Sequence, residues 1–271
     1  MEPVNAWIEI QPGEVTQALT DLFDLAAPTA IRAFAVLAGG IRGRIFTDDL
    51  TQPAWGLVWE SDDGTLYRGG RLTRELLAGV ISLLRQEKLV ALGFQDGDTD
   101  QALFPPEPNA GADCLEFDRP SGASDLSALV SRLPPEFALR RMDRALLERI
   151  PRLEEKLSRY GSLENLLDTG LAVCGLRGEE IACEAYADFA VRGVRELGVT
   201  TQVAYRGLGI ATATCAYLLQ WCEAEGNAAF WDCARLNLPS VALARRLGFG
   251  NERAYRLLAW FPGDFYGKNE N

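Results

Sequence analysis

The hydrophobic positions of this chain follow two patterns, helical spacing and short apolar runs typical of strands, which together predict a mixed α/β protein. Apolar residues three and four positions apart predict helices at 15–25, 31–37, 73–87, 128–133, 146–157, 163–167, 212–224 and 237–247. Apolar runs predict strands at 54–60, 65–69, 89–94, 113–117, 137–142, 170–176, 180–189, 195–202, 228–233 and 253–261. Asp143 and Ser162 are expected to cap helices, and Pro151 is expected to kink or restart the helix around it.

Proline-marked breaks between Pro120 and Pro135 indicate a domain boundary in the middle of the chain. A chain of 271 residues with 48% hydrophobic content can form two ordinary domains, each with its own core. We therefore expect an N-terminal α/β domain over residues 1–130, whose sequence holds no motif for chemistry, and a second domain over residues 131–271.

The composition is acidic, with a formal net charge of −11. This charge argues against nucleic acid or an anionic membrane as the main partner, because both require a basic surface, and it favours cationic small molecules. No apolar run of about 18 residues occurs and the first residues have no signal-peptide pattern. A cytoplasmic location is the expectation.

The chain contains no histidine, which excludes Ser-His-Asp and Cys-His nucleophile activation and the His-Glu-x-x-His zinc site. Its six cysteines lie at irregular spacings in apolar segments, as expected of buried free thiols. Asp96, Asp98 and Asp100 alternate like calcium ligands, but Gln101 occupies the sixth position, where a calcium loop needs glycine. We expect a solvated turn there and no metal site.

The most informative segment runs from Gln202 to Thr212, where a predicted strand ends in an Arg-Gly-Leu-Gly turn and a helix begins. The first N–H groups of a helix have no intrahelical partner, so several of them can converge on one phosphate group. Gly207 and Gly209 allow a ligand to approach the backbone closely. The turn therefore predicts an anion-binding site, although most isolated Gly-x-Gly triplets only satisfy backbone geometry.

The Arg206-Gly207-Leu208-Gly209-Ile210-Ala211 turn, together with Asn237, Ser240 and Gly248-Phe249, resembles the GNAT acetyltransferase superfamily over about residues 135–261. The Trp231-Asp232-Cys233-Ala234 stretch before Asn237 is similar to a two-domain bacterial branch of that superfamily. The resemblance implies a mixed, mostly antiparallel sheet flanked by helices, preceded by a smaller α/β domain.

The resemblance also implies acetyl-CoA or another acyl-CoA, with its pyrophosphate on the glycine turn and its pantetheine arm between two diverging strands, like an added strand. The residues that it assigns to cofactor binding are Val203, Arg206, Gly207, Leu208, Gly209, Ile210, Ala211, Thr212, Asn237 and Ser240. For Asn237 a role as helix cap alone is an equally good interpretation, and the two roles can coexist.

Acetyl transfer to an amine needs a base, an oxyanion donor and an acid for the thiolate. Glu196, near where superfamily members often place a catalytic glutamate, is the first candidate for the base, and Glu184 on the preceding strand is the second. The tyrosine that many relatives carry as the acid is replaced by Ala244. The substitutes considered are Tyr205, Tyr217 and Tyr255, or water.

The resulting hypothesis is an acetyl-CoA-dependent N-acetyltransferase that acts on a small-molecule amine. The alternative is a non-catalytic acyl-CoA-binding regulatory or sensor protein, for which Ala244 is the argument. The identity of the acceptor and the oligomeric state, including a homodimer, are left open by the sequence.

Overall fold

The computed structural model describes residues 7–120 and 122–261. The chain forms two compact units: unit 1 comprises Met1–Cys114 and Ala254–Asn271, and unit 2 comprises Leu115–Arg253. Within the described residues no helix combines the length and apolar character needed to cross a membrane.

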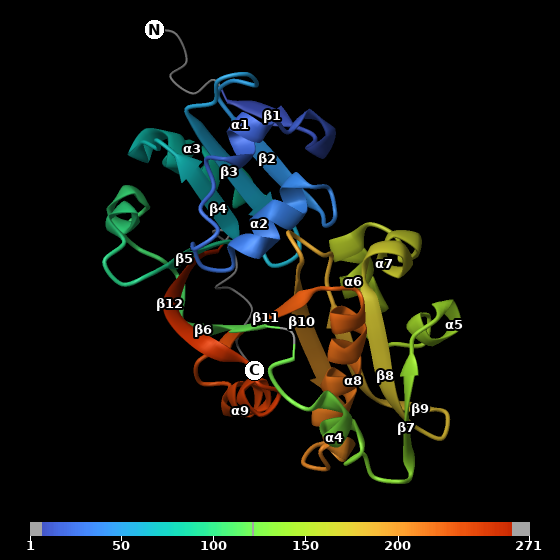
Figure 1. Ribbon diagram of the computed structural model, residues 1–271. Coiled ribbons are helices and arrows are strands. Elements are labelled where there is room, and N and C mark those ends of the chain that lie inside the picture. The colour runs from blue at the N-terminus through green and yellow to red at the C-terminus, as the bar shows by residue number, and fades with distance from the viewer. Residues whose placement is uncertain (1–6, 121, 262–271) are drawn as a thin grey trace, which may run out of the picture. The chain divides into compact units, whose positions relative to one another are not determined.

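Unit 1 is built on an antiparallel four-stranded sheet of order β1-β2-β3-β4 (Figure 1). Its elements are β1 (Ile8–Ile10), η1 (Pro12–Glu14), α1 (Gln17–Thr20), α2 (Ala30–Leu37), β2 (Gly43–Thr47), β3 (Trp55–Glu60), β4 (Leu66–Gly70), α3 (Arg74–Leu84), β5 (Val90–Phe94) and η2 (Thr99–Leu103). Every residue of β3 is buried. One buried cluster joins Trp59 of β3 to Leu77 and Ile81 of α3, whose spacing places both on one helix face.

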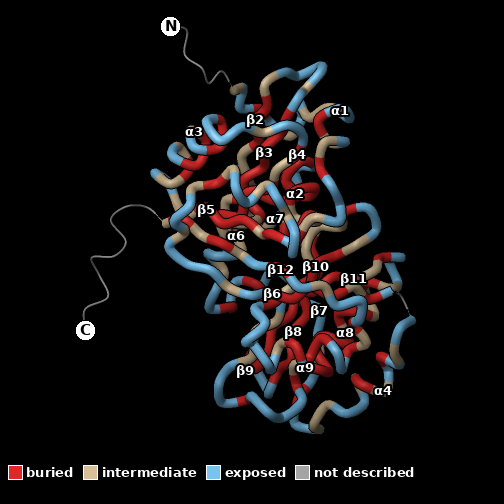
Figure 2. Tube along the Cα trace, turned by 90° about the vertical axis from the view of Figure 1, so that its left-hand side faces the viewer, coloured by how far each residue is buried: buried red, intermediate tan, exposed pale blue. Residues whose placement is uncertain are grey.

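Unit 2 contains the strand order β6-β11-β10-β9-β8-β7. Its elements are α4 (Leu126–Val130), β7 (Phe137–Arg141), α5 (Arg144–Leu147), α6 (Leu153–Tyr160), α7 (Leu163–Thr169), β8 (Leu171–Arg177), β9 (Glu180–Ala187), β10 (Val194–Thr201), η3 (Val203–Tyr205), α8 (Ile210–Ala224), β11 (Ala228–Ala234) and α9 (Leu238–Arg246). Buried residues follow the strands and α8 (Figure 2).

Side-chain alternation along the strands gives the sheet of unit 2 two covered faces. Val173, Ala185 and Leu197 belong to a buried cluster with α8 residues such as Leu218. Neighbouring positions on the same strands, such as Tyr186, belong instead to a cluster with α5, α6 and α7. Residues of even number near the middle of β9 and β10 therefore face the side of the sheet that α6 covers.

Two long strands, β6 (Ala110–Arg119) and β12 (Gly250–Trp260), each begin in one unit and end in the other. In unit 1, β5 pairs antiparallel with the second half of β12. In unit 2, β11 lies next to β6. The last strand of the second half of the chain, β12, thus completes unit 1, and the last strand of the first half, β6, completes unit 2. For this reason the two units do not match the predicted division of the sequence between residues 130 and 131.

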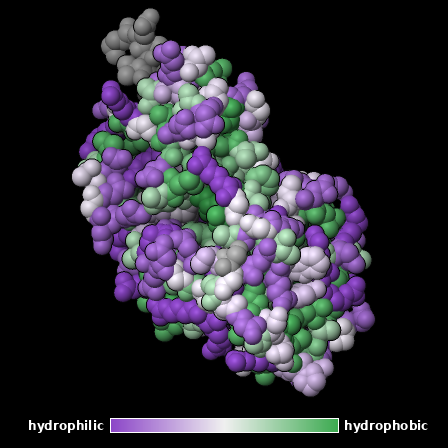
Figure 3. Space-filling view, in the orientation of Figure 1, coloured by the Kyte–Doolittle hydropathy of each residue, from purple (hydrophilic) through white to green (hydrophobic). Residues whose placement is uncertain are grey.

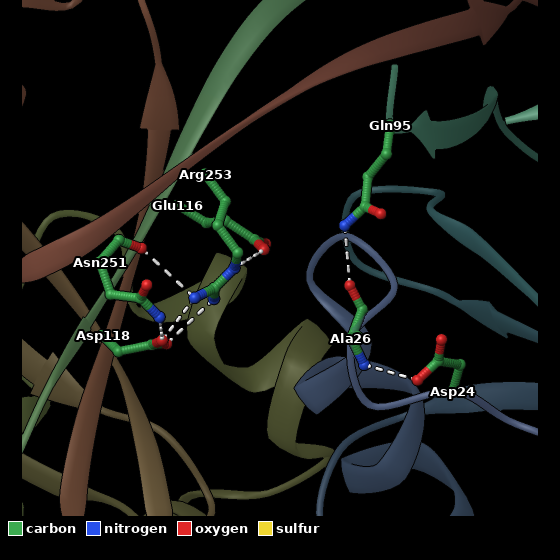
Figure 4. Close-up of polar contacts among 7 residues, drawn as sticks. All are labelled: Asp24, Ala26, Gln95, Glu116, Asp118, Asn251 and Arg253. Carbon is green, nitrogen blue, oxygen red and sulfur yellow. Dashed lines mark hydrogen bonds and ion pairs between the residues drawn. The ribbon is translucent and has the colours of Figure 1, made fainter. Parts of the chain in front are cut away.

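Arg253 ties the unit 2 portions of β6 and β12 together (Figure 4). Its Nε donates to Glu116 Oε1 at 2.8 Å, and its Nη2 donates to Asp118 Oδ1 at 3.0 Å. Asn251 donates from Nδ2 to Asp118 Oδ2 at 2.6 Å. The hydrogen bonds with Asp118 raise the pKa of Arg253, so its guanidinium stays charged in this contact.

The two halves of the chain repeat one order of elements: a strand, short helices, three antiparallel strands, a helix, a strand, a short helix and a long final strand. The first half runs from β1 to β6 and the second from β7 to β12. The predicted N-terminal α/β domain is therefore a second version of the same fold.

Most predicted elements are present, and the exceptions have local causes. Asp143 caps α5, since its Oδ1 accepts a hydrogen bond from Leu146 N at 2.9 Å. The helix predicted at 146–157 is interrupted, because α5 ends at Leu147 and α6 begins only after Pro151. The helix predicted at 15–25 is wrong in extent, because α1 covers four residues. The short strands β1 and β2 were not predicted, since three and five residues are too few for a clear pattern.

Candidate active site

The strands β10 and β11 of unit 2 pair at one end and then separate. Within the described residues their parallel register runs from Val194 opposite Ala228 to Glu196 opposite Phe230. From Leu197 onwards β10 continues to pair with β9, up to Thr201, while its other edge is no longer matched by β11. A strand edge whose N–H and C=O groups lack a neighbouring strand can pair with an extended ligand.

The helix α8 begins beside this gap without a side-chain cap. Gly209, the N-cap residue, has φ of +80° and Gly207 has φ of +79°, values that favour glycine. A Cβ atom added at either position would meet nothing within 4 Å, so the turn is open on its outer side. No acidic residue lies in the first turn of α8. These features leave the positive end of the helix dipole available to an anion.

The side chains of this segment divide into two groups. Ile210 and Thr212 are buried, so these residues offer a ligand their backbone N–H groups rather than their side chains. Ala211 packs against the core. Arg206 is exposed, and its Nε donates to Thr201 O at 3.2 Å, which keeps the guanidinium beside the end of β10.

Four exposed apolar side chains flank the starts of α8 and α9. They are Val203, Leu208, Leu236 and Leu238, with exposures of 76, 49, 89 and 69%. These are all the large hydrophobic residues that unit 2 exposes among its described residues. An apolar rim around a polar helix end fits a ligand with both a charged and an apolar part.

Asn237 caps α9, as one of the two predicted roles requires, because its Oδ1 accepts a hydrogen bond from Ser240 N at 3.3 Å. The Ser240 hydroxyl accepts a hydrogen bond from the indole of buried Trp231 at 3.0 Å. Ser240 therefore anchors the core, and both residues lie at the N-terminal end of α9, which follows β11.

Glu196 lies at the last described pair of β10 and β11, where the gap begins. Its side chain is 10% exposed, and its Oε2 lies 3.9 Å from Arg159 Nη2. Arg159 also forms a closer ion pair with Asp188, at 2.8 Å. Tyr160 donates its hydroxyl to the same Asp188 at 2.7 Å. Glu196 is thus held on the α6 side of the sheet by a buried charge network.

Glu184 shares that face of the sheet. The strand register places Glu184 opposite Thr200 and Tyr186 opposite Gly198. Tyr186 donates its hydroxyl to Glu184 Oε2 at 2.7 Å. The exposed Gly198 has nothing within 4 Å of an added Cβ, which leaves room above β10 at this point. Both predicted glutamates therefore face the same side of the sheet, Glu196 on β10 where the gap begins and Glu184 on the neighbouring strand β9.

Two residues of this polar group were not singled out from the sequence. Lys156 of α6 lies with Nζ 4.0 Å from the centre of the Tyr186 ring, and burial lowers its pKa. Burial also raises the pKa of Tyr186. The alternation of Glu184 and Tyr186 two positions apart signals a shared face, but the position of Lys156 depends on how α6 packs.

The tyrosines considered as proton donors lie in other environments. Tyr205 packs edge-on against Phe137 at 5.7 Å, and its hydrogen bond to Glu180 raises its pKa. Tyr217 packs against Trp221 on the outer part of α8. Ala244 is completely buried in the main cluster of unit 2. The described Cys, Asp and Glu side chains form no group of three that is suited to hold a metal ion.

The sequence matches the family model of the GNAT acetyltransferases over residues 28–258. It is 23% identical over 243 residues to the uncharacterized N-acetyltransferase YdfB of Bacillus subtilis (strain 168), covering 86% of this chain and 91% of that protein. A GCN5-related N-acetyltransferase-like protein from Streptococcus suis 89/1591 has a similar structure, with a TM-score of 0.66 and 22% identity over 92% of this chain and 100% of the other.

A tandem GNAT protein from the clavulanic acid biosynthesis pathway also has this fold, with a TM-score of 0.65 and 12% identity over 95% of this chain and 98% of the other. The chain belongs to the GNAT acetyltransferase family. This confirms the predicted family and the predicted mixed α/β fold with mainly antiparallel sheets flanked by helices. Members of this family use acetyl-CoA or CoA.

Proposed function

We propose that this protein is an acetyl-CoA-dependent N-acetyltransferase that transfers the acetyl group directly to a small-molecule amine. The observation that carries the proposal is the separation of β10 from β11 immediately after Glu196, next to the uncapped start of α8. An unpaired strand edge and an open helix end meet the needs of a ligand with an extended amide arm and a pyrophosphate.

In this proposal the backbone N–H groups from Leu208 to Thr212 bind the pyrophosphate, and Arg206 adds a positive charge beside them. Val203 and Leu208 supply apolar contacts at the rim, where they are exposed. Asn237 combines its role as cap of α9 with a hydrogen bond to the arm of the cofactor, and Ser240 supports it at the same helix end.

The chemical step breaks the thioester C–S bond and forms an amide C–N bond. Glu196 accepts the proton of the acceptor ammonium, directly or through water, and Glu184 is the second candidate for this role. A backbone N–H of the free β10 edge near Leu197 polarises the thioester carbonyl. As the C–N bond forms, the amine nitrogen loses its second proton, which passes through water to the departing thiolate, because the tyrosine position of α9 holds the buried Ala244.

A second candidate function is a non-catalytic acyl-CoA sensor. The specific observation that favours it is again Ala244, which packs in the core and offers no proton donor. This candidate predicts acetyl-CoA binding without release of free thiol for any amine. The proposal also includes a cytoplasmic location. It does not specify which amine is the acceptor or whether the protein forms a homodimer.

The test is free-thiol release from acetyl-CoA with a broad panel of primary amines. Glu196→Gln should lower the turnover rate about 100-fold or more while leaving acetyl-CoA binding unchanged, because only the base is lost. Glu184→Gln is measured in parallel, and Glu179→Gln, at an exposed turn between β8 and β9, is the matched control. Turnover that is unchanged in Glu196→Gln but lost in Glu184→Gln would reassign the base, and binding without any turnover would favour the sensor.

A further inference from the structure

Unit 1 has its own pair of diverging strands. A single parallel bridge joins Thr65 to Ala91, and Ala91 N donates to Gly64 O at 2.9 Å. Beyond this bridge β4 is the edge of one sheet and β5 is the edge of another. In the repeated order of elements, β4 and β5 correspond to β10 and β11. Unit 1 therefore holds the counterpart of the gap that carries the proposed acetyl-CoA site in unit 2.

A cavity of about 260 Å³ occupies this gap. Tyr67 to Gly70 of β4 line one side, and Gly93 and Gln95 line the other. The segment between α1 and α2 closes it with the apolar side chains of Leu22, Phe23 and Pro28. Gln95 holds this segment in place, because its Nε2 donates to Ala26 O at 2.8 Å (Figure 4).

The helix that follows β4 is unsuited to a pyrophosphate. Thr73 caps α3, since its Oγ1 accepts a hydrogen bond from Leu76 N at 3.3 Å. Glu75 places a negative charge in the first turn. A helix start that is already capped and carries a carboxylate gives an anion much less stabilisation than the uncapped start of α8.

The charges around the cavity favour a cation. Three carboxylates, Asp24, Asp98 and Asp100, line it together with one guanidinium, Arg68. Arg68 forms ion pairs with both Asp98 and Asp100 and stacks over Phe94, so its charge is already neutralised. Asp24 belongs to the segment between α1 and α2, where its Oδ1 accepts a hydrogen bond from Ala26 N at 2.8 Å. The cavity has an excess of two negative charges beside apolar and aromatic walls.

From the cavity, its position in the repeated fold and its charge we propose that unit 1 binds a small organic cation, a primary amine with an apolar or aromatic body. Asp24 pairs with the ammonium group, and Leu22, Phe23 and Tyr67 contact the apolar body. One copy of the repeated gap is thus proposed to bind the acyl donor and the other an amine. The site goes beyond the proposed acetyl transfer and does not depend on it.

The test is calorimetry of the full-length protein with 2-phenylethylamine in the absence of acetyl-CoA. The expected result is saturable binding of the amine. Its affinity should be at least about 10-fold higher than that of two control ligands with a similar apolar body, the neutral 2-phenylethanol and the anionic 3-phenylpropionate. Asp24→Asn keeps the side-chain shape and should weaken amine binding about 10-fold. Ala27→Leu, at a half-buried lining position, should abolish binding by filling the cavity.

Glu107→Gln removes the same charge at an exposed position outside the cavity and should leave amine binding unchanged. Gly209→Glu, which disrupts the proposed acetyl-CoA turn, should also leave it unchanged. Equal binding of the alcohol, binding insensitive to both Asp24→Asn and Ala27→Leu, or no saturable binding up to about 10 mM would overturn the proposal. Loss of amine binding in Glu196→Gln would place the amine in unit 2, which overturns this site while supporting the proposed acetyltransferase.

Discussion

The starts of α3 and α8 occupy the same place in the two copies of the fold, yet they offer opposite environments to a ligand. The start of α8 has a glycine N-cap in the left-handed conformation and no acidic residue in its first turn. The start of α3 is capped by the Thr73 side chain and carries Glu75. A helix dipole is common to both, so the identity of two or three residues decides whether it is available to an anion.

The gaps beside these two helices also differ in the polarity and charge of the residues around them. In unit 2 the exposed rim is apolar, and Gly198 leaves free space above the strand. In unit 1 the space is lined by carboxylates, and glycines of both strands lie in close contact with the segment after α1. Repetition of a backbone arrangement therefore does not repeat its chemistry. Hydrophilic side chains cover much of the face shown in Figure 3, in keeping with the net charge of −11.

The largest difference between the two helix starts should appear in acetyl-CoA binding. Gly209→Glu places a carboxylate at the proposed pyrophosphate position and should raise the Kd on the order of 100-fold, about 2.7 kcal/mol. Titration calorimetry with purified protein measures the change. Gly209→Ala imposes the same backbone strain at φ of +80° without the charge, so it should weaken binding much less.

Arg74→Glu at the start of α3 is the matched change in unit 1 and should leave the acetyl-CoA affinity unaltered. Equal losses from Gly209→Glu and Arg74→Glu would remove the distinction between the two helix ends. A loss of acetyl-CoA affinity in Arg74→Glu alone would place the acetyl-CoA site at the start of α3 instead of α8.

The next largest effect concerns protein stability, when a glycine beside each gap is replaced by alanine. A Cβ at Gly69 would lie 2.6 Å from Leu22 O, whereas a Cβ at Gly198 would meet nothing within 4 Å. Gly69→Ala should lower the free energy of unfolding by about 2 kcal/mol, because a backbone atom must move to relieve the overlap. Gly198→Ala should change it by less than about 0.5 kcal/mol.

Urea unfolding followed by circular dichroism compares these two variants. The bulkier Gly198→Val should remain folded and lower turnover, because it fills the space beside Tyr186. A stable Gly69→Ala variant would show that the gap in unit 1 is as loose as the one in unit 2.

The two helix caps provide a smaller and more selective comparison. Thr73→Ala and Asn237→Ala should each cost about 1 kcal/mol of unfolding free energy, since each removes one cap hydrogen bond. Only Asn237→Ala should also raise the Kd for acetyl-CoA. If both variants lose stability and neither changes the Kd, Asn237 is a cap and nothing more.

The smallest effect is expected in mildly alkaline solution and concerns unit 2. Five of the six cysteines lie there, and burial raises the pKa of Cys174 to about 11 and that of Cys222 to about 12. The folded state therefore keeps protons that the unfolded state loses above about pH 9, so stability falls as pH rises towards these values.

Urea unfolding at about pH 8 and about pH 10 measures this fall in the free energy of unfolding. Cys174→Ala should show a shallower fall than the parent protein, because it removes one of the groups concerned. An unchanged slope in Cys174→Ala and in Cys222→Ala would assign the alkaline loss to other groups.

Much of unit 2 could be predicted because its signals are local. The strand-turn-helix at 195–224 depends on residues that are neighbours in sequence, and so does the cap at Asn237. The candidate site could be predicted for the same reason, since an anion turn is a property of one short segment. Lys156 escaped prediction because it reaches Tyr186 only through the packing of α6 on the sheet.

The sequence by itself determined the family, the mixed α/β class, the open turn before α8 and the two glutamates on neighbouring strands, because each rests on local pattern and spacing. Only the tertiary structure decided that β6 and β12 complete the opposite units, that the N-terminal half repeats the fold, and that its gap holds a cavity lined by carboxylates. These features come from pairing between segments far apart in the chain, and no local spacing encodes which strand edge will find which partner.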